Sequence, residues 1–212
     1  MIIGVPKEIK LQEHRIGLTP DSVKVLTDKG HEVLVQTNGG FEAGFTDVNY
    51  KNAGGKIISS AEEIFRKAEL IVKVKEPQES EVKLIRESQI IYTYLHLAAA
   101  KKLTEGLIKS KSICIAYETV TDDNGRLPLL APMSAVAGRM SIQAGAHSLE
   151  KNQKGRGLLL GGAPGVEPAN IVILGGGVVG ENAAIIATGM RGKVYVVDKS
   201  KERLKQLHEM FG

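Results

Sequence analysis

Residues 175–180, of sequence GGGVVG, follow an apolar, β-branched run and open a helical pattern. Their G-x-G-x-x-G spacing is the one that lets a strand-to-helix turn hold a dinucleotide pyrophosphate. Gly175 permits the tight turn, Gly177 lets the backbone approach the phosphates because it has no Cβ, and Gly180 lets the helix pack close to the strand. The N-terminus of that helix offers N–H groups and a partial positive charge to the anion. A glycine-rich turn without a ligand is the alternative.

An acidic residue stands where such a motif needs one. The expected second strand, 193–197, ends at Asp198, which lies 18 residues beyond Gly180. A carboxylate there accepts a hydrogen bond from a ribose 2′-OH and repels a 2′-phosphate, which favours NAD over NADP. The basic residues Lys199, Lys201 and Arg203 follow and weaken that preference. For the two lysines a solvated helix face is an equally good interpretation.

Three polar residues in the N-terminal half follow apolar, strand-like runs. Arg15 lies in a loop after the first run, Lys75 ends the run 70–75, and His96 stands near the end of the run 90–97. A guanidinium suits a carboxylate, and a histidine exchanges protons near neutral pH. A surface arginine, a solvated lysine and a buried core histidine are the plain alternatives. No Cys/His pair has the spacing of metal ligands, so no metal site is expected.

Composition restricts the class of protein. The chain has 212 residues, of which 42% are apolar and 25% charged, as in folded globular proteins. The net charge of +4 comes from lysines spread along the chain, and there is no Trp, so nucleic-acid binding is not expected. The one cysteine, Cys114, excludes an intrachain disulfide and fits a reducing compartment. Without a membrane-length apolar run or a signal peptide, a cytoplasmic protein is expected.

The elements that position these residues alternate between strand and helix. Strands are expected at 2–5, 31–36, 56–58, 70–75, 90–97, 112–116, 169–174 and 193–197, and helices at 47–53, 79–87, 98–109, 133–150 and 201–211, with further helices starting after Thr19, Ser60 and Gly177. This alternation predicts an α/β fold, a parallel sheet with helices on both faces. Ligands of such sheets bind beyond the carboxyl ends of the strands, where Arg15, Lys75 and His96 are expected.

Several longer motifs carry a family resemblance. They are GVPKE at 4–8, EHR at 13–15, VKVKEP at 72–77, YLHLA at 94–98, PMSAVAGR at 132–139 and LGGAPGV at 160–166, together with the glycine segment, Asp198 and Arg203. The chain resembles the alanine dehydrogenase/pyridine nucleotide transhydrogenase family, and its motifs look most like those of alanine dehydrogenases. Proton-translocating transhydrogenase subunits share the fold but match these motifs less well.

The resemblance implies NAD-dependent oxidative deamination of L-alanine to pyruvate and ammonia, and the reverse reaction. It assigns Arg15 and Lys75 to the substrate carboxylate and carbonyl, and His96 to acid/base work. It also implies a cytoplasmic homohexamer. Around the NAD it places Ser134, Val178, Val179, Asp198 and Arg203.

Two Rossmann-like domains are therefore expected, 1–128 as the N-terminal part of a substrate domain and 129–212 as the first part of an NAD-binding domain. A helix with small residues at Ala137, Gly138, Ala144 and Gly145 is expected to connect them and to pack tightly against a domain or subunit. A complete dinucleotide domain has about six strands, and only two are expected here, so the second domain is predicted to be incomplete. In the family, a catalytic aspartate comes from later sequence. Two alternatives stay open: a chain that binds nucleotide without turnover until another chain completes it, and a transhydrogenase-type NAD(H) domain.

Overall fold

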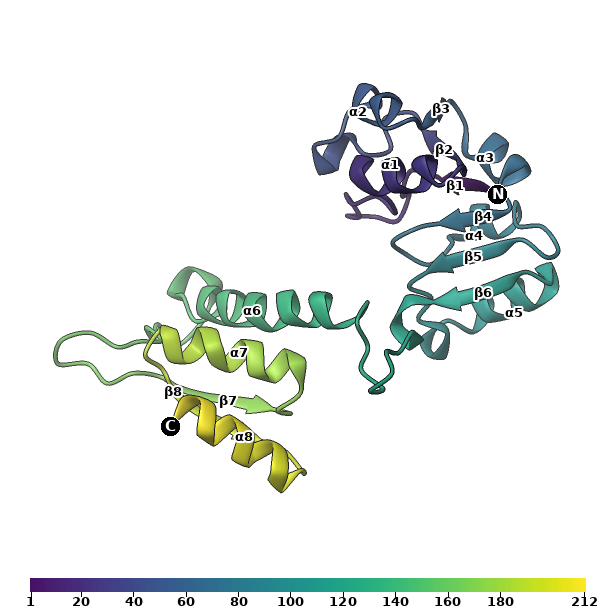
Figure 1. The fold of residues 1–212 in the computed structure, drawn as a ribbon. Helices are drawn as coiled ribbons and strands as arrows, with labels where there is room; N and C mark the ends of the chain where they lie inside the picture. Colours follow the sequence, from purple (N-terminus) through teal and green to yellow (C-terminus); the bar gives the residue numbers. More distant parts are fainter. The chain divides into compact units, whose positions relative to one another are not determined.

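The computed structural model describes residues 1–212 and divides them into two compact units, Met1–Val120 and Thr121–Gly212. Each unit has its own sheet (Figure 1). None of the helices is both long enough and apolar enough to cross a membrane.

The first unit is a six-stranded sheet in which every pairing is parallel. The strands are β1 (Ile2–Val5), β2 (Glu32–Gln36), β3 (Lys56–Ile58), β4 (Leu70–Val72), β5 (Ile90–Thr93) and β6 (Ile113–Ala116), and the helices are α1 (Pro20–Asp28), α2 (Asp47–Asn52), α3 (Ala61–Lys67), α4 (Glu79–Val82) and α5 (Lys101–Ser110). The expected α/β class with a parallel sheet is confirmed.

The strand order β3-β2-β1-β4-β5-β6 places the start of the chain at the centre of the sheet. Successive strands run outward from β1 in one direction and then, from β4 on, in the other. The carboxyl ends of β1 and β4 therefore flank the point where the order reverses, which is where open α/β sheets bind their ligands.

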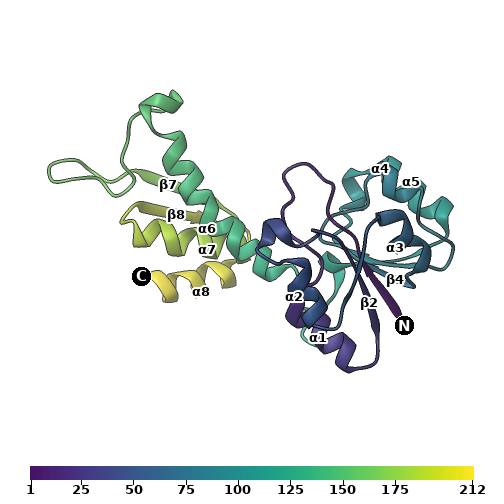
Figure 2. The ribbon, with the colours of Figure 1, turned by 90° about the horizontal axis from the view of Figure 1, so that it is seen from above.

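Helices cover both faces of this sheet (Figure 2). On one face, Val23 of α1 and Tyr50 of α2 pack against Val33 and Val35 of β2. On the other face, α3 and α5 cover a second group of buried apolar side chains: Leu34, Ile64, Phe65, Ile71, Ile91 and Leu107. In β2, Val33 and Val35 face one side and Leu34 faces the other, which explains why its three central residues are all apolar.

The helix starts expected from the sequence are present. The Thr19 hydroxyl accepts a hydrogen bond from the Ser22 N–H before Pro20 opens α1, and the Ser60 hydroxyl accepts one from the Glu63 N–H before α3. These short polar side chains satisfy N–H groups that have no partner inside the helix.

Several element ends differ from the expected ones. The strand expected at 70–75 ends at Val72. The Lys73 N–H still donates to the Tyr92 carbonyl of β5, but the N–H groups of Val74 and Lys75 donate to the Glu8 carboxylate instead. The run 90–97 leaves its ladder after Thr93, and the expected helix 79–87 shrinks to α4. The expected helix 98–109 starts only at Lys101, behind a short 3-10 turn.

The second unit has five elements. They are α6 (Ala131–Ser148), β7 (Asn170–Leu174), α7 (Val178–Gly189), β8 (Lys193–Val197) and α8 (Lys201–Phe211). Strands β7 and β8 pair in parallel and form a sheet of two strands. On one face, Ile171 and Ile173 contact buried alanines of α7. On the other face a row of apolar side chains is more than half exposed: Val172, Leu174, Tyr195 and Val197.

Helix α6 lies very close to α7. A Cβ on Gly138 would come within 2.2 Å of the Val179 carbonyl oxygen, so only glycine allows this approach. The expectation that small residues bring this helix close to a neighbour is thus met at Gly138, and the neighbour is α7 of the same unit. Gly145 contributes nothing to it, because a Cβ there would meet no atom within 4 Å.

Candidate functional site

The three polar candidates of the first unit all lie beyond the carboxyl ends of neighbouring strands. Arg15 stands in the loop that follows β1, Lys75 three residues after β4 and His96 three residues after β5. Because β1, β4 and β5 are adjacent and parallel, their carboxyl ends share one edge of the sheet. None of the three residues belongs to a strand, and each is held by a glutamate.

Arg15 is held by Glu13. The Arg15 Nε donates to Glu13 Oε1 at 2.8 Å and its Nη2 donates to Oε2 at 2.6 Å, a bidentate pair. Hydrogen bonds from this guanidinium lower the pKa of Glu13 to about 2, and the charge of Lys75 contributes. The two cations therefore lie beside the same carboxylate. The Glu13 side chain is only 6% exposed whereas that of Arg15 is 47% exposed, so the positive charge faces outward.

The Lys75 segment is held by Glu8, which follows β1. Glu8 Oε1 accepts hydrogen bonds from the Val74 N–H at 2.6 Å and the Lys75 N–H at 3.4 Å. Its other oxygen, Oε2, lies 3.0 Å from the ammonium of Lys73. That ammonium also donates to Glu81 Oε1 at 2.7 Å. A buried ionic network thus fixes the backbone that carries Lys75.

This network of Glu8, Lys73 and Glu81 is almost fully shielded from water. Lys73 is 0% exposed, Glu8 6% and Glu81 3%. Burial raises the pKa of Glu81, and the nearby Lys73 charge opposes that shift. Because ions are costly to bury, such a network persists only when its charges and lone pairs find partners. The second oxygen of Glu81 finds one in the N–H of Gln78.

His96 is held by Glu118, which follows β6. The His96 N–H donates to Glu118 Oε1 at 2.8 Å. The His96 backbone is left-handed, with φ 50° and ψ 38°, a region that non-glycine residues rarely adopt. Its imidazole is exposed and stacks near the Tyr94 ring, with the ring centroids 6.4 Å apart.

These side chains can bind and protonate a small anionic molecule. Arg15 and Lys75 supply two positive charges, and His96 supplies an imidazole, a group that can donate or accept a proton. Tyr94 links the set, because its ring stacks near His96 while the Arg15 charge acts on its phenol against the pKa increase that burial causes. No group of three or more His, Cys, Asp or Glu side chains is placed to hold a metal ion.

In the second unit the glycine segment forms the expected turn from β7 into α7. Gly175 has φ +95°, which only glycine adopts without strain. A Cβ on Gly180 would lie 1.8 Å from the Gly175 carbonyl oxygen, so the first helical turn packs directly on the loop. A Cβ on Gly177 would meet no atom within 4 Å, and Gly177 caps α7 without a side-chain hydrogen bond. The first turn of α7 therefore has no side-chain cap, and the space beside Gly177 is open.

Asp198 and Arg203 both contact this loop. Asp198 Oδ2 accepts a hydrogen bond from the Gly176 N–H at 2.7 Å, and its Oδ1 accepts one from Ser200 at 2.8 Å. These two bonds lower the pKa of Asp198. Arg203 donates through Nε to the Gly176 carbonyl at 2.6 Å and forms an ion pair with Glu181.

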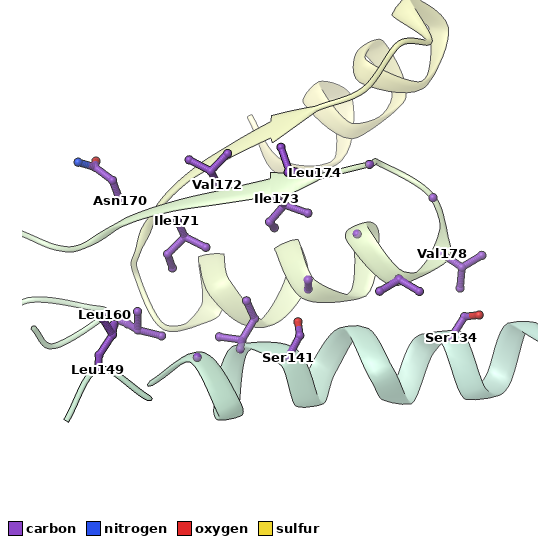
Figure 3. Close-up of a pocket in the computed structure, with 17 residues that line it drawn as sticks. Ser134, Ser141, Leu149, Leu160, Asn170, Ile171, Val172, Ile173, Leu174 and Val178 are labelled. Carbon is purple, nitrogen blue, oxygen red and sulfur yellow. The ribbon is translucent and has the colours of Figure 1, made fainter. Parts of the chain in front are cut away.

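Ser134 joins the same region from α6. Figure 3 shows it opposite Val178 at the start of α7, with Ile171 and Ile173 pointing into the pocket and Val172 and Leu174 pointing away. The pocket has a volume of about 700 Å³. Its lining includes these site candidates: Ser134, Gly175, Gly177, Val178, Val179 and Gly180. A second hollow, at the start of α6 and α7, is lined by Ser134, Gly177, Val178 and Arg203.

This arrangement fits a dinucleotide. The open space at Gly177 is what a pyrophosphate near the helix N-terminus requires. Asp198 lies one hydrogen bond from the loop, at the end of the neighbouring strand, where a ribose hydroxyl would be recognised. Each oxygen of Asp198 accepts one hydrogen bond from a backbone N–H, which leaves lone-pair capacity for a further donor.

Sequence reasoning missed the residues that hold the candidates. The sequence alone assigns no role to Glu8, Glu13 and Glu118, and it places Lys73 inside the strand expected at 70–75. For Glu8 and Glu13 a signal was available, since both lie in motifs that carry the family resemblance. For Lys73 the signal was a charged residue between two valines in an otherwise buried run.

Comparisons with known proteins cover the whole chain. The family model "Alanine dehydrogenase/PNT, N-terminal domain" matches residues 4–137, and "Alanine dehydrogenase/PNT, C-terminal domain" matches residues 141–212. The curated alanine dehydrogenase of Halomonas elongata is 53% identical over 211 residues, which is 100% of this chain and 57% of that protein. The chain thus spans little more than half the length of such relatives.

Two solved structures complete the comparison. An L-alanine dehydrogenase structure matches with a TM-score of 0.91 at 52% identity, over 100% of this chain and 58% of that one. The transhydrogenase of Sinorhizobium meliloti matches with a TM-score of 0.81 at 21% identity, over 99% of this chain and 60% of that one. At that identity the second match shows a shared fold only.

Proposed function

This chain belongs to the alanine dehydrogenase/PNT family, and on that premise we propose that it serves the NAD-dependent oxidative deamination of L-alanine to pyruvate and ammonia, and the reverse reaction. The observation that supports the proposal is the position of Arg15, Lys75 and His96 in the segments that leave three adjacent parallel strands, of which β1 and β4 flank the switch point of the sheet. Two cations and an imidazole are what a small α-amino or α-keto acid requires.

Each of these residues has a distinct task in the proposal. Arg15 and Lys75 bind the carboxylate and the carbonyl oxygen of the substrate, and Glu13 keeps the guanidinium in a fixed plane through two hydrogen bonds. His96 takes up or releases a proton at the substrate oxygen or nitrogen as the carbonyl forms or is consumed. The exposed position of its imidazole lets the proton exchange with water.

The second unit supplies the nucleotide site of the proposal. NAD, when bound, provides the acceptor for the hydride that leaves the substrate α-carbon. The N–H groups at the start of α7 bind its pyrophosphate, with Ser134, Val178 and Val179 beside them. Asp198 accepts a hydrogen bond from the adenosine ribose. Because Arg203 already bonds the Gly176 carbonyl and Glu181, its charge is engaged within the protein, which supports NAD over NADP.

Alanine-dependent formation of NADH by the full 212-residue chain tests the proposal. Activity that is lost in His96→Ala and kept in His208→Ala, a histidine of α8 with no place in the site, would support it. A chain that binds NADH but shows no alanine-dependent turnover would contradict it.

A second candidate is a chain that binds nucleotide without turnover until another polypeptide completes it. The exposed apolar face of the sheet of β7 and β8 favours it. Activity that appears only when a second polypeptide is added would support this candidate. Hydride exchange between two nucleotides without alanine would instead support a transhydrogenase-type NAD(H) domain.

The ribose assignment has its own test. Asp198→Ala should weaken NAD binding by about 1.5–3 kcal/mol, the value of a hydrogen bond to a charged group, measured by calorimetric titration. Asp198→Asn keeps one oxygen for the Gly176 N–H and separates ribose recognition from loop support. Asp28→Ala, which removes an exposed charge of α1, is the control. Unchanged NAD affinity in both Asp198 variants would refute the assignment.

The family resemblance also supports a cytoplasmic homo-oligomer, with six subunits as in typical members. Sedimentation velocity of the purified chain measures that state directly, and a monomer at micromolar concentration would contradict it.

A further inference from the structure

Glu118 is the acidic residue nearest to His96 along the hydrogen-bond network, and it comes from a different strand end. It lies in a short 3-10 turn, Tyr117–Thr119, directly after β6. Because β6 pairs in parallel with β5, with Thr93 opposite Ala116, the segments that leave the two strands run side by side. The Glu118 side chain bridges them.

Its carboxylate binds two successive backbone N–H groups. Oε1 accepts from the Leu95 N–H at 3.0 Å and from the His96 N–H at 2.8 Å, and Oε2 lies 3.2 Å from the Leu95 N–H. A carboxylate bound by converging N–H groups is a strong, charge-assisted contact. Burial acts to raise the pKa of Glu118, but these N–H bonds and the charge of His96 hold the pKa below its usual range.

The segment needs such a contact. His96 adopts a left-handed backbone conformation at φ 50°, and a non-glycine residue stays there only when its surroundings impose it. If His96 relaxed to the ordinary right-handed region, its imidazole would leave its place beside Tyr94. The other charged group that acts on His96 is Glu76, and Tyr94 is the titratable group that stacks on it.

We propose that Glu118 is a positioning residue for the reaction, which holds His96 in its left-handed conformation and so sets where the imidazole meets the substrate. The proposal rests on the function proposed above, because it assigns the proton exchange to His96. Glu118 itself need not touch the substrate.

Two variants separate the hydrogen bonds of Glu118 from its charge. Since Oε1 accepts from both the Leu95 and the His96 N–H, the amide oxygen of Glu118→Gln can keep one bond to each N–H, while the substitution removes the charge and the second Leu95 contact at Oε2. Glu118→Ala removes the hydrogen bonds and the charge. In the full chain, NMR follows the His96 amide, its hydrogen exchange and the His96 imidazole signal, with and without pyruvate. His31, whose N–H donates to the Leu26 carbonyl, is the internal control.

In Glu118→Ala the His96 amide should shift and exchange on the order of tenfold faster or more, and pyruvate should perturb the imidazole at least about tenfold more weakly, while His31 stays unchanged. Glu118→Gln should keep the amide signal and the pyruvate response of the native chain. A His96 amide that is unchanged in Glu118→Ala would overturn the proposal, and so would a Glu118→Gln variant that behaves like Glu118→Ala. If the native chain binds pyruvate without any response at His96, the proposed function fails, and the role of Glu118 in the reaction fails with it. The amide data would still show whether Glu118 holds the His96 backbone.

Discussion

Replacing Lys73 by methionine should destabilise the first unit strongly. The Lys73 ammonium lies 3.0 Å from Glu8 Oε2 and 2.7 Å from Glu81 Oε1, and all three side chains are buried. Methionine keeps much of the aliphatic volume and removes the charge. The variant therefore leaves two buried carboxylates without their counter-ion, although each still accepts a backbone N–H.

The expected cost is about 3–5 kcal/mol at pH 7, the range for a buried ion pair that loses one partner. A unit of 120 residues has a free energy of unfolding of roughly 6–18 kcal/mol at ordinary stabilities per residue. The variant thus loses a large share of the unit's free energy of unfolding. The segment that carries Lys75 should loosen first, since Glu8 fixes its backbone.

The cost should also depend on pH. Burial already raises the folded-state pKa of Glu81 above 4.5, and the Lys73 charge that opposes this shift is absent in the variant. A carboxyl with a raised folded-state pKa holds a proton that the unfolded chain has released, so stability falls as pH rises above the unfolded pKa. The loss is absent below that pKa and grows by about 1.4 kcal/mol for each unit of further shift. Lys73→Met should therefore cost more at pH 7 than at pH 4.5.

The measurement is a urea titration followed by hydrogen exchange at the amides of β1 and β4, which reports on the first unit alone. Lys67→Met is the matched control, because Lys67 pairs with Glu63 on the exposed side of α3 and its loss should change the free energy of unfolding very little. The double variant Lys73→Met/Glu81→Gln should recover part of the loss. A cost below about 1 kcal/mol at pH 7, or an equal cost at both pH values, would refute the reasoning.

Two further substitutions, one in each unit, test a close backbone contact and a hydrogen bond. Gly180→Ala forces a Cβ against the Gly175 carbonyl, so it should lower the free energy of unfolding in urea by about 1–3 kcal/mol and weaken NAD binding. Gly189→Ala in the same helix is the control. Its Cβ meets open space, so it should be neutral or stabilising by up to about 1 kcal/mol. Tyr50→Phe removes the hydroxyl that donates to the Leu18 carbonyl at 3.0 Å and should cost about 1–3 kcal/mol, because it leaves a partly buried acceptor without this donor; a change near zero would contradict this.

Local patterns in the sequence predicted most of the fold. Apolar runs separated by helix starts gave the parallel sheet, and residues 175–180 gave the turn between β7 and α7. What they missed is where strands end. In the run 70–75, Val74 beyond the end of the strand is as buried as a strand residue, but its N–H is bound by Glu8, a side chain from the segment that follows β1. Hydrophobicity records burial and does not record which group accepts a hydrogen bond.

The supporting glutamates were out of reach for the same reason. Glu8 and Lys73 are 65 residues apart, and Glu118 is 22 residues from His96, so no local spacing connects them. Which segments lie side by side follows from the order of the strands in the sheet. The sequence predicts the fold class but not that order. Glu13 is the exception, since it lies two residues from Arg15 and a local carboxylate–guanidinium pair was open to inference.

Strand order supplies a rule that local spacing lacks. A segment that leaves a strand carries N–H groups that must find acceptors, and in a parallel sheet the nearest chain is the segment that leaves the adjacent strand. Glu8 after β1 serves the segment after β4, and Glu118 after β6 serves the segment after β5. A carboxylate does this better than a carbonyl because it accepts several N–H bonds at once and is charged. In a family with this topology, an acidic residue just beyond one strand is therefore a candidate support for the functional residue just beyond its neighbour, even where it never contacts the substrate.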